Sequence, residues 1–342
     1  MAALSRLLSV IATVALLAGC LPSSCRRIES RDISSADSLS RRMASVITPD
    51  SLQSFEPLRV STMAWPRTVF FASDGSLYAS DVESARIFEF SSTGDLRREI
   101  AGDSLKAPYI AGLRGDTLLV FNPEARRIDF LLQGAFVHSV WLPRDIPREA
   151  LLYAAAGPAD LYLKVTGRNL SGYILRIGGD GVIRARTPLS GSEWHNAGQL
   201  RVWGDTLVSL SGFLPRVDIV PADLSRLPDS LALRGFDSPM LRRTYSFLKG
   251  ETRQAPLLSG SAAAAGGLLF VLNMRPGWLR VDVYDRAGIL RHILLGGEPG
   301  YDKRFYPMDI AVRPLPDGSF DLAVAVKEPV PEVRRFRWAG DN

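Results

Sequence analysis

The sequence predicts an all-β protein built from six copies of one small antiparallel sheet. Two observations predict this fold. A glycine turn followed by short strands of alternating polar and apolar residues recurs along the body of the chain. When one apolar position is aligned between copies, the spacings are 41, 43, 46, 62 and 51 residues, as in a repeat with insertions; the aligned residues are Leu77, Leu118, Leu161, Leu207, Leu269 and Phe320.

The first 19 residues have the pattern of an export signal. Arg6 precedes an apolar run over residues 7–17, which is shorter than the about 20 residues that a membrane-spanning helix requires. The run leads into Leu-Ala-Gly-Cys at 17–20, which resembles the lipobox of bacterial lipoproteins. The resemblance implies that the mature chain begins at Cys20 and carries lipid there, and that Leu21 favours the outer over the inner membrane. An ordinary signal peptide or a buried N-terminal helix is the alternative.

Residues 20–50 are expected to form a flexible tether. They are rich in serine and arginine and poor in large apolar side chains, so they cannot bury enough surface to offset their ordering entropy. A short helix is expected within them around Asp37 to Val46. Cys25 is the second of only two cysteines, so the body of the chain has neither a disulfide framework nor a cysteine metal site.

The body, residues 51–342, is predicted to close into a ring. Each copy has room for four short strands, and such sheets are marginal alone but bury their faces when arranged radially. The last copy ends at Trp338, one strand short, and a strand over Leu58 to Thr62 precedes the first copy. We expect that strand to complete the last sheet. The predicted architecture is a six-bladed β-propeller, with seven or eight blades or a β-sandwich as alternatives.

The first copy resembles the NHL repeat, a glycine turn, two strands with characteristic residues and a second glycine turn. The matching residues are Leu77, Tyr78, Asp81, Arg86, Ile87, Phe88 and Gly94. Residues 296–300 and 306–310 are similar to the connection between blades of such propellers. The match is good in the first, second and fifth copies and poor in the others. The resemblance is to NHL-repeat-like six-bladed propeller lipoproteins of bacteria, and it implies a fold more than a function.

A helical insertion near residues 238–250 interrupts the repeat. It has serine at the expected N-cap, proline at the first position and glycine after the last lysine. Leu241, Tyr245 and Leu248 are expected to share its apolar face. This helix would lie on one face of the ring, either as a cover over apolar residues or as a lid over a ligand.

The candidate binding residues lie in loops. Loops between second and third strands should converge on one face and offer amide, guanidinium and indole groups suited to a glycan, a peptide or a protein surface. A further loop places an imidazole beside an indole. The candidates are Arg168, Asn169, Trp194, His195, Asn273, Arg275 and Trp278. Asp81/Arg86 and Asn122/Arg127 recur at one spacing, which favours a structural role for these pairs.

The sequence contains no recognisable catalytic motif. It lacks a Gly-x-Ser-x-Gly elbow, a His-Glu-x-x-His pair, an EF-hand and a phosphate-binding loop. His195 has no identifiable Asp or Ser partner and no second histidine at metal-ligand spacing. No cofactor is predicted, although Ca²⁺ or another metal held in a central channel is left open because its ligands would be distant in sequence.

The net charge of +5 does not indicate a nucleic-acid-binding protein, because the basic residues are single or paired and the chain is exported. A weak attraction to anionic membranes is the most that the charge supports. The sequence favours a monomeric, lipid-anchored propeller of the bacterial cell envelope that binds or scaffolds a protein, peptide or glycan, rather than an enzyme. The alternatives are a propeller hydrolase or lyase with a channel metal, and an accessory of an envelope stress or sensor system.

Overall fold

The structure, a computed structural model, describes residues 30–167, 170–297 and 301–340. The chain divides into two units, Met1–Ser38 and Leu39–Asn342, and helix α2 (Ser30–Ser45) includes the boundary between them. Helix α2 contains the helix expected around Asp37 and begins seven residues earlier. The export signal, Cys20 and Cys25 lie outside the described residues. None of the helices in the described ranges is long and apolar enough to span a membrane.

Four sheets of Leu39–Asn342 are antiparallel and four-stranded, with strands in sequence order. The first contains β2 (Pro66–Phe71), β3 (Leu77–Asp81), β4 (Arg86–Phe90) and β5 (Leu96–Ala101). The second contains β6 (Tyr109–Arg114), β7 (Thr117–Asn122), β8 (Arg127–Leu132) and β9 (Ala135–Trp141). The third contains β10 (Leu151–Ala156), β11 (Leu161–Thr166), β12 (Tyr173–Ile177) and β13 (Ile183–Pro188). The fourth contains β14 (Leu200–Trp203), β15 (Thr206–Leu210), β16 (Arg216–Pro221) and β17 (Asp229–Ala232).

The remaining strands form one eight-stranded sheet. Four antiparallel strands make up one part: β18 (Ser259–Ala265), β19 (Leu268–Asn273), β20 (Arg280–Tyr284) and β21 (Leu290–Gly296). Three make up the other: β22 (Tyr306–Pro314), β23 (Phe320–Glu328) and β24 (Glu332–Trp338). Strand β1 (Asp50–Ser54) joins the parts, because it runs parallel to β21 at residues 50–52 and antiparallel to β24 at residues 53–54.

The expected closing strand was placed wrongly. The N-terminal segment does pair with β24, but through β1 and not through residues 58–62. Of these residues, Leu58 alone forms a bridge, with Val333. Pro57 has no N–H to donate to a ladder, and the Met63 N–H turns back to the Val60 carbonyl at 2.9 Å, so the chain bends where a strand was predicted.

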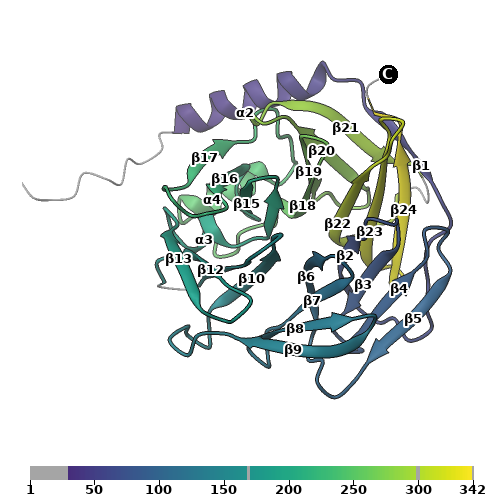
Figure 1. The fold of residues 1–342 in the computed structure, drawn as a ribbon. Helices are drawn as coiled ribbons and strands as arrows, with labels where there is room; N and C mark the ends of the chain where they lie inside the picture. The colour runs from purple at the N-terminus through teal and green to yellow at the C-terminus, as the bar shows by residue number, and fades with distance from the viewer. Residues whose placement is uncertain (1–29, 168–169, 298–300, 341–342) are drawn as a thin grey trace, which may run out of the picture. The chain divides into compact units, whose positions relative to one another are not determined.

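The sheets are arranged around a common centre (Figure 1). Their first strands contact one another in the order β2, β6, β10, β14, β18 and β22, and β22 contacts β2. Apolar clusters fill the spaces between neighbours. The cluster between β22–β24 and β2–β4, for example, contains Val69, Ala79, Met308 and Ala323. The prediction of an all-β, propeller-like arrangement of four-stranded sheets is confirmed.

The repeat alignment also agrees with the structure. All six aligned residues lie at the first or second position of a second strand, namely β3, β7, β11, β15, β19 and β23. All six are buried, from Leu161 and Leu207, which are fully inaccessible, to Phe320, which is 8% exposed. The alignment therefore identified core positions that are equivalent in three dimensions.

Helix α4 (Leu241–Leu248) occupies the predicted insertion. It is shorter than expected: the helix begins at Leu241, three residues after Ser238, whose hydroxyl accepts the Met240 N–H at 3.2 Å. Leu241 and Thr244 are its buried residues, whereas Leu248 is 37% exposed. Tyr245 is partly buried, so the expected apolar face is buried at its start and reaches solvent at Leu248, where the helix ends. A single-turn helix, α3 (Glu193–Asn196), was not predicted.

Candidate functional site

Polar residues at the ends of second strands hold the chain that enters each sheet. The buried Asp81 carboxylate accepts N–H groups from Ala64 (2.8 Å), Trp65 (2.6 Å), Glu83 (3.1 Å) and Ser84 (2.8 Å). These contacts join residues that precede β2 to the end of β3. A carboxylate saturated in this way is a structural group with no free lone pair directed at a ligand.

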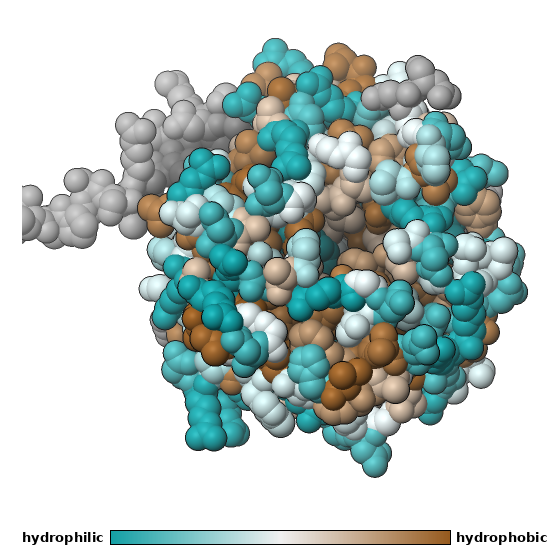
Figure 2. Space-filling view, in the orientation of Figure 1, coloured by the Kyte–Doolittle hydropathy of each residue, from teal (hydrophilic) through white to brown (hydrophobic). Residues whose placement is uncertain are grey.

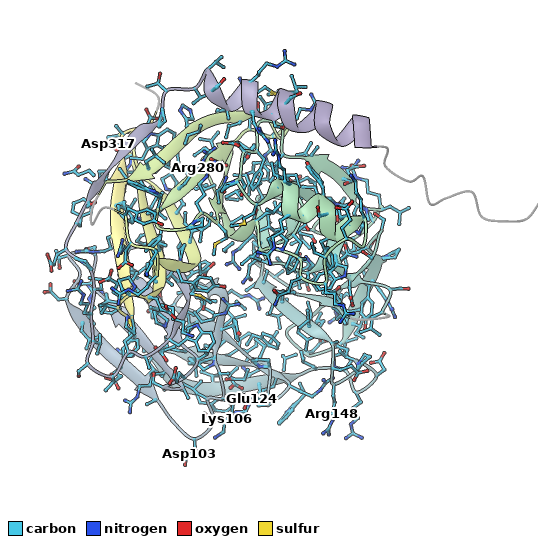
Figure 3. The ribbon with its side chains drawn as sticks, turned by 180° about the vertical axis from the view of Figure 1, so that it is seen from behind. Asp103, Lys106, Glu124, Arg148, Arg280 and Asp317 are labelled. Carbon is cyan, nitrogen blue, oxygen red and sulfur yellow. The ribbon has the colours of Figure 1, made fainter. Side chains whose placement is uncertain are left out.

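In two other sheets an asparagine at the end of the second strand makes a similar contact with the incoming chain. Asn122 accepts the Lys106 N–H at 3.0 Å, and Asn273 donates to the Asp237 carbonyl at 3.0 Å. Figure 3 shows Lys106 and Arg280, which lies in the strand following the Asn273 loop, at opposite sides of the molecule. Asn273, although predicted as a ligand contact, is 1% exposed and also donates to Asp282 at 2.6 Å. It therefore closes a sheet, as Asn122 does.

Trp194 and His195 anchor the α3 segment. The Trp194 ring meets Phe213 and Phe247 edge-on, with centroids at 5.2 and 4.8 Å, so it fastens α4 to the neighbouring loop. His195 Nδ1 accepts the Ser192 N–H at 3.1 Å and caps α3. Burial, and to a smaller extent the Arg216 guanidinium, lowers the pKa of His195. Both side chains thus shape the surface on which α4 lies.

Backbone hydrogen bonds connect this region to the β19–β20 loop. The Gly212 N–H donates to Ala197 O at 2.7 Å, Leu258 N–H to Gly212 O at 2.7 Å, and Met274 N–H to Leu258 O at 2.9 Å. Arg275 then donates to the Asp237 carboxylate at 2.7 Å. Residues that lie far apart in sequence thereby form one continuous surface.

A groove of about 720 Å³ lies on this surface. Its walls come from the start of α4, the segment before β18, the β19–β20 loop, the connection into β22 and the end of β23. The cationic lining residues are Arg243, Arg275, Lys303, Arg304 and Lys327, and the other lining residues are Met240, Pro256, Leu257, Met274, Pro276, Phe305, Tyr306 and Glu328. We call this site the cationic groove.

The five cations of the groove differ in their partners. Arg275 is paired with Asp237 at 2.7 Å, and Arg304 with Asp302 at 3.0 Å. Within the described residues, Arg243, Lys303 and Lys327 pair with no carboxylate. The Lys327 ammonium lies 3.5 Å from the centroid of the Trp65 ring, a cation–π contact that leaves its charge uncompensated. The groove consequently attracts anions.

The central channel is a different environment. Its cavity of about 170 Å³ is lined mainly by apolar residues of the first strands. The buried Asp309 carboxylate accepts hydrogen bonds from Arg201 (2.6 Å), the Val69 N–H (3.0 Å) and the Ser261 hydroxyl. Among the described residues, no three or more His, Cys, Asp or Glu side chains are grouped so that they could hold a metal ion. The Asp309 carboxylate is therefore occupied by donors of the chain itself.

The structure brings only some of the predicted site residues together. Arg275 lines the cationic groove, and Trp278 stands outside it, 48% exposed with its ring 5.8 Å from that of Tyr301. Arg168 and Asn169 lie outside the described residues. The groove cations Arg243, Lys303 and Lys327 were not predicted from the sequence. One signal was available: the chain has only five lysines, and two of them line this groove.

No protein family and no curated protein matches the sequence. Solved structures do resemble the fold. Regucalcin from Agrobacterium tumefaciens, described as a calcium-binding protein, is 14% identical, with a TM-score of 0.53 over 86% of this chain and 98% of that one. A luciferin-regenerating enzyme is 13% identical, with a TM-score of 0.53 over 82% and 95% of the chains. A catalytically inactive virginiamycin B lyase from Staphylococcus aureus, solved with quinupristin, is 13% identical, with a TM-score of 0.52 over 84% and 99%. These are propeller-type proteins, and the likeness shows the fold alone.

Proposed function

We propose that this protein is a lipid-anchored propeller of the bacterial cell envelope that binds an anionic group of a protein, peptide or glycan in the cationic groove. One observation carries the proposal: three cations of one groove, Arg243, Lys303 and Lys327, have no carboxylate partner among the described residues. Clustered like charges repel one another, so an anionic ligand would relieve the repulsion as it binds.

The propeller in this proposal has six blades. Strands β18–β21 form a fifth four-stranded unit, and β22–β24 with β1 form a sixth. The six apolar clusters support this count. Each of them fills the space between two consecutive units, including one between β18–β21 and β22–β24. The parallel pairing of β1 with β21 makes these two units continuous in the sheet.

The location follows from the N-terminal sequence. A lipid on Cys20 would anchor the chain to a membrane. Residues 20–50, which include α2, would separate the propeller from that membrane. Leu21 favours the outer membrane over the inner one. The face shown in Figure 2 mixes hydrophilic and hydrophobic side chains without one continuous patch of either kind. In this proposal the chain is a monomer that meets its partner through the cationic groove.

The alternative is a hydrolase or lyase with a metal in the central channel. Asp309, a buried carboxylate whose partner Arg201 lines the channel cavity, is already bound by a guanidinium, a hydroxyl and an N–H group. We therefore favour binding over metal-dependent catalysis.

Calorimetric titration of the full chain with inorganic phosphate and with tetraglutamate tests the proposal, with tetralysine as the opposite-charge control. We expect both anions to bind, more weakly as salt rises, and tetralysine not to bind. The double variant Lys303→Gln/Lys327→Gln should weaken binding about tenfold, whereas Lys249→Gln, an exposed lysine outside the groove, should not. If neither anion binds, or if the double variant binds them as well as the native chain does, the cationic groove is not the site.

A further inference from the structure

We propose that the ligand of the cationic groove is an amphiphile in which a phosphate monoester is joined to a flexible apolar chain. This inference rests on the proposed function and specifies the chemistry of its ligand. Two features of the groove support this inference: positive charge that no carboxylate neutralises, and an apolar wall that faces solvent.

The uncompensated charge corresponds to a dianion. Arg243, Lys303 and Lys327 contribute three positive charges, and Glu328, the acidic lining residue, contributes one negative charge, which leaves a net charge of 3 − 1 = +2. Arg275 and Arg304 add nothing, because each is paired with an aspartate. A phosphate monoester carries about −1.5 to −2 at pH 7 and presents three acceptor oxygens. A single carboxylate would leave a cation without a partner.

The apolar wall is formed by two segments that are held together. Pro256 and Leu257 precede β18, and Met274 and Pro276 follow β19. The hydrogen bond from the Met274 N–H to the Leu258 carbonyl, 2.9 Å long, joins the two segments. Leu257 and Met274 are both partly exposed. Met240, at the start of α4, adds a second methionine. Methionine is unbranched and adapts its shape, which suits a flexible chain better than a rigid ring.

The cations stand mainly on the other wall. Lys303 belongs to the connection into β22, and Lys327 lies near the end of β23, next to Glu328, which pairs with Tyr306 of β22. A head group at Lys303 and Lys327 would therefore leave the attached chain free to lie along Leu257 and Met274. Because the groove combines these cations with apolar side chains, it distinguishes an amphiphile from a bare anion and from an uncharged lipid.

Titration calorimetry of the full chain with alkyl phosphates of increasing length, kept below their micelle concentrations, tests this inference. The probes are inorganic phosphate, butyl phosphate, hexyl phosphate and octyl phosphate, with octyl glucoside as the uncharged control. A fully buried methylene tightens binding about fourfold, and in this half-open groove we expect about twofold per methylene, or about 16-fold from butyl to octyl phosphate. Octyl glucoside should bind far more weakly than octyl phosphate.

Variants separate the two walls. Leu257→Ser should reduce the gain from chain length, while Lys303→Gln should weaken all the phosphates alike. Leu248→Ser, at an exposed position outside the groove, is the matched control, and melting curves establish that the variants are folded. If phosphate binds as tightly as octyl phosphate, free phosphate is the ligand and the inference fails, although the proposed function survives. If no phosphate binds but tetraglutamate does, this inference alone fails; if neither binds, the proposed function fails as well.

Discussion

A buried lysine makes the stability of this fold depend on pH in an unusual direction. Lys164, in β11, is fully inaccessible to solvent. Its ammonium donates to the carbonyls of Gly198 (2.9 Å) and Leu210 (3.0 Å). Gly198 has φ +149°, and a Cβ at this position would lie 2.4 Å from the Leu210 oxygen, so only glycine lets the two carbonyls converge. We expect Lys164→Met to remove this pH dependence.

The size of the effect follows from the pKa. Burial lowers the pKa of Lys164 from 10.5 to about 7, with Arg216 lowering it further and Asp218 opposing the shift. Between pH 7 and 10.5 the amine is neutral in the folded chain and protonated in the unfolded chain. The unfolded state then binds more protons, so the free energy of unfolding rises with pH by about 1.4 kcal/mol per pH unit. Between pH 7 and pH 10.5 the free energy of unfolding therefore rises by about 5 kcal/mol in total. Below pH 7 the amine is protonated in both states, so this pH dependence is absent.

Denaturant titrations from pH 6 to pH 9.5 measure the difference. Relative to the Lys164→Met variant, the native chain should gain about 2–3 kcal/mol between pH 7.5 and 9.5 and almost nothing between pH 6 and 6.5. Lys249→Met, at an exposed position, should follow the native chain. Burial raises the pKa of Tyr153 above its usual 10, so that phenol does not titrate in this window. Parallel curves for the native chain and Lys164→Met above pH 7.5 would refute the reasoning.

Two further predictions concern the ring itself and use denaturant unfolding at neutral pH. Asp81→Ala leaves four N–H groups without their acceptor and should lower the free energy of unfolding by about 3 kcal/mol or more. The control is Glu83→Ala, at an exposed position beside Asp81, which should change the free energy of unfolding by less than about 0.5 kcal/mol. Equal effects of the two substitutions would show that these hydrogen bonds do not hold the sheet. Leu52→Ala removes a side chain of β1 that is 4% exposed and should destabilise by about 2–5 kcal/mol, with Ser51→Ala as the exposed control. An unchanged midpoint for Leu52→Ala would mean that β1 does not fasten the ring.

The repeat was readable from the sequence because it is a matter of local periodicity. Leu77 and Leu161 each follow a glycine turn by a few residues and precede another alternating strand, and the structure buries both at the start of a second strand. A strand with one apolar face and a short turn needs no distant information to be recognised.

The closing strand was misplaced because the local sequence pattern favours the wrong one of two segments. Leu58 to Thr62 alternates as a strand should, whereas β1 contains a single large apolar residue, Leu52. Strands β21 and β24 leave room for one strand between their edges, and β1 occupies that place. That space exists only once the other sheets have formed.

The amino-acid sequence by itself determined the repeat, the strand order within each unit and the helical insertion, because neighbours along the chain carry those signals. The tertiary structure alone decided which charges remain unpaired. Arg275 and Lys303 look equivalent in sequence, yet Asp237 neutralises the first and the described residues offer no carboxylate to the second. Electrostatic compensation depends on distances of a few ångströms between segments that are dozens of residues apart, and only the folded chain fixes those distances.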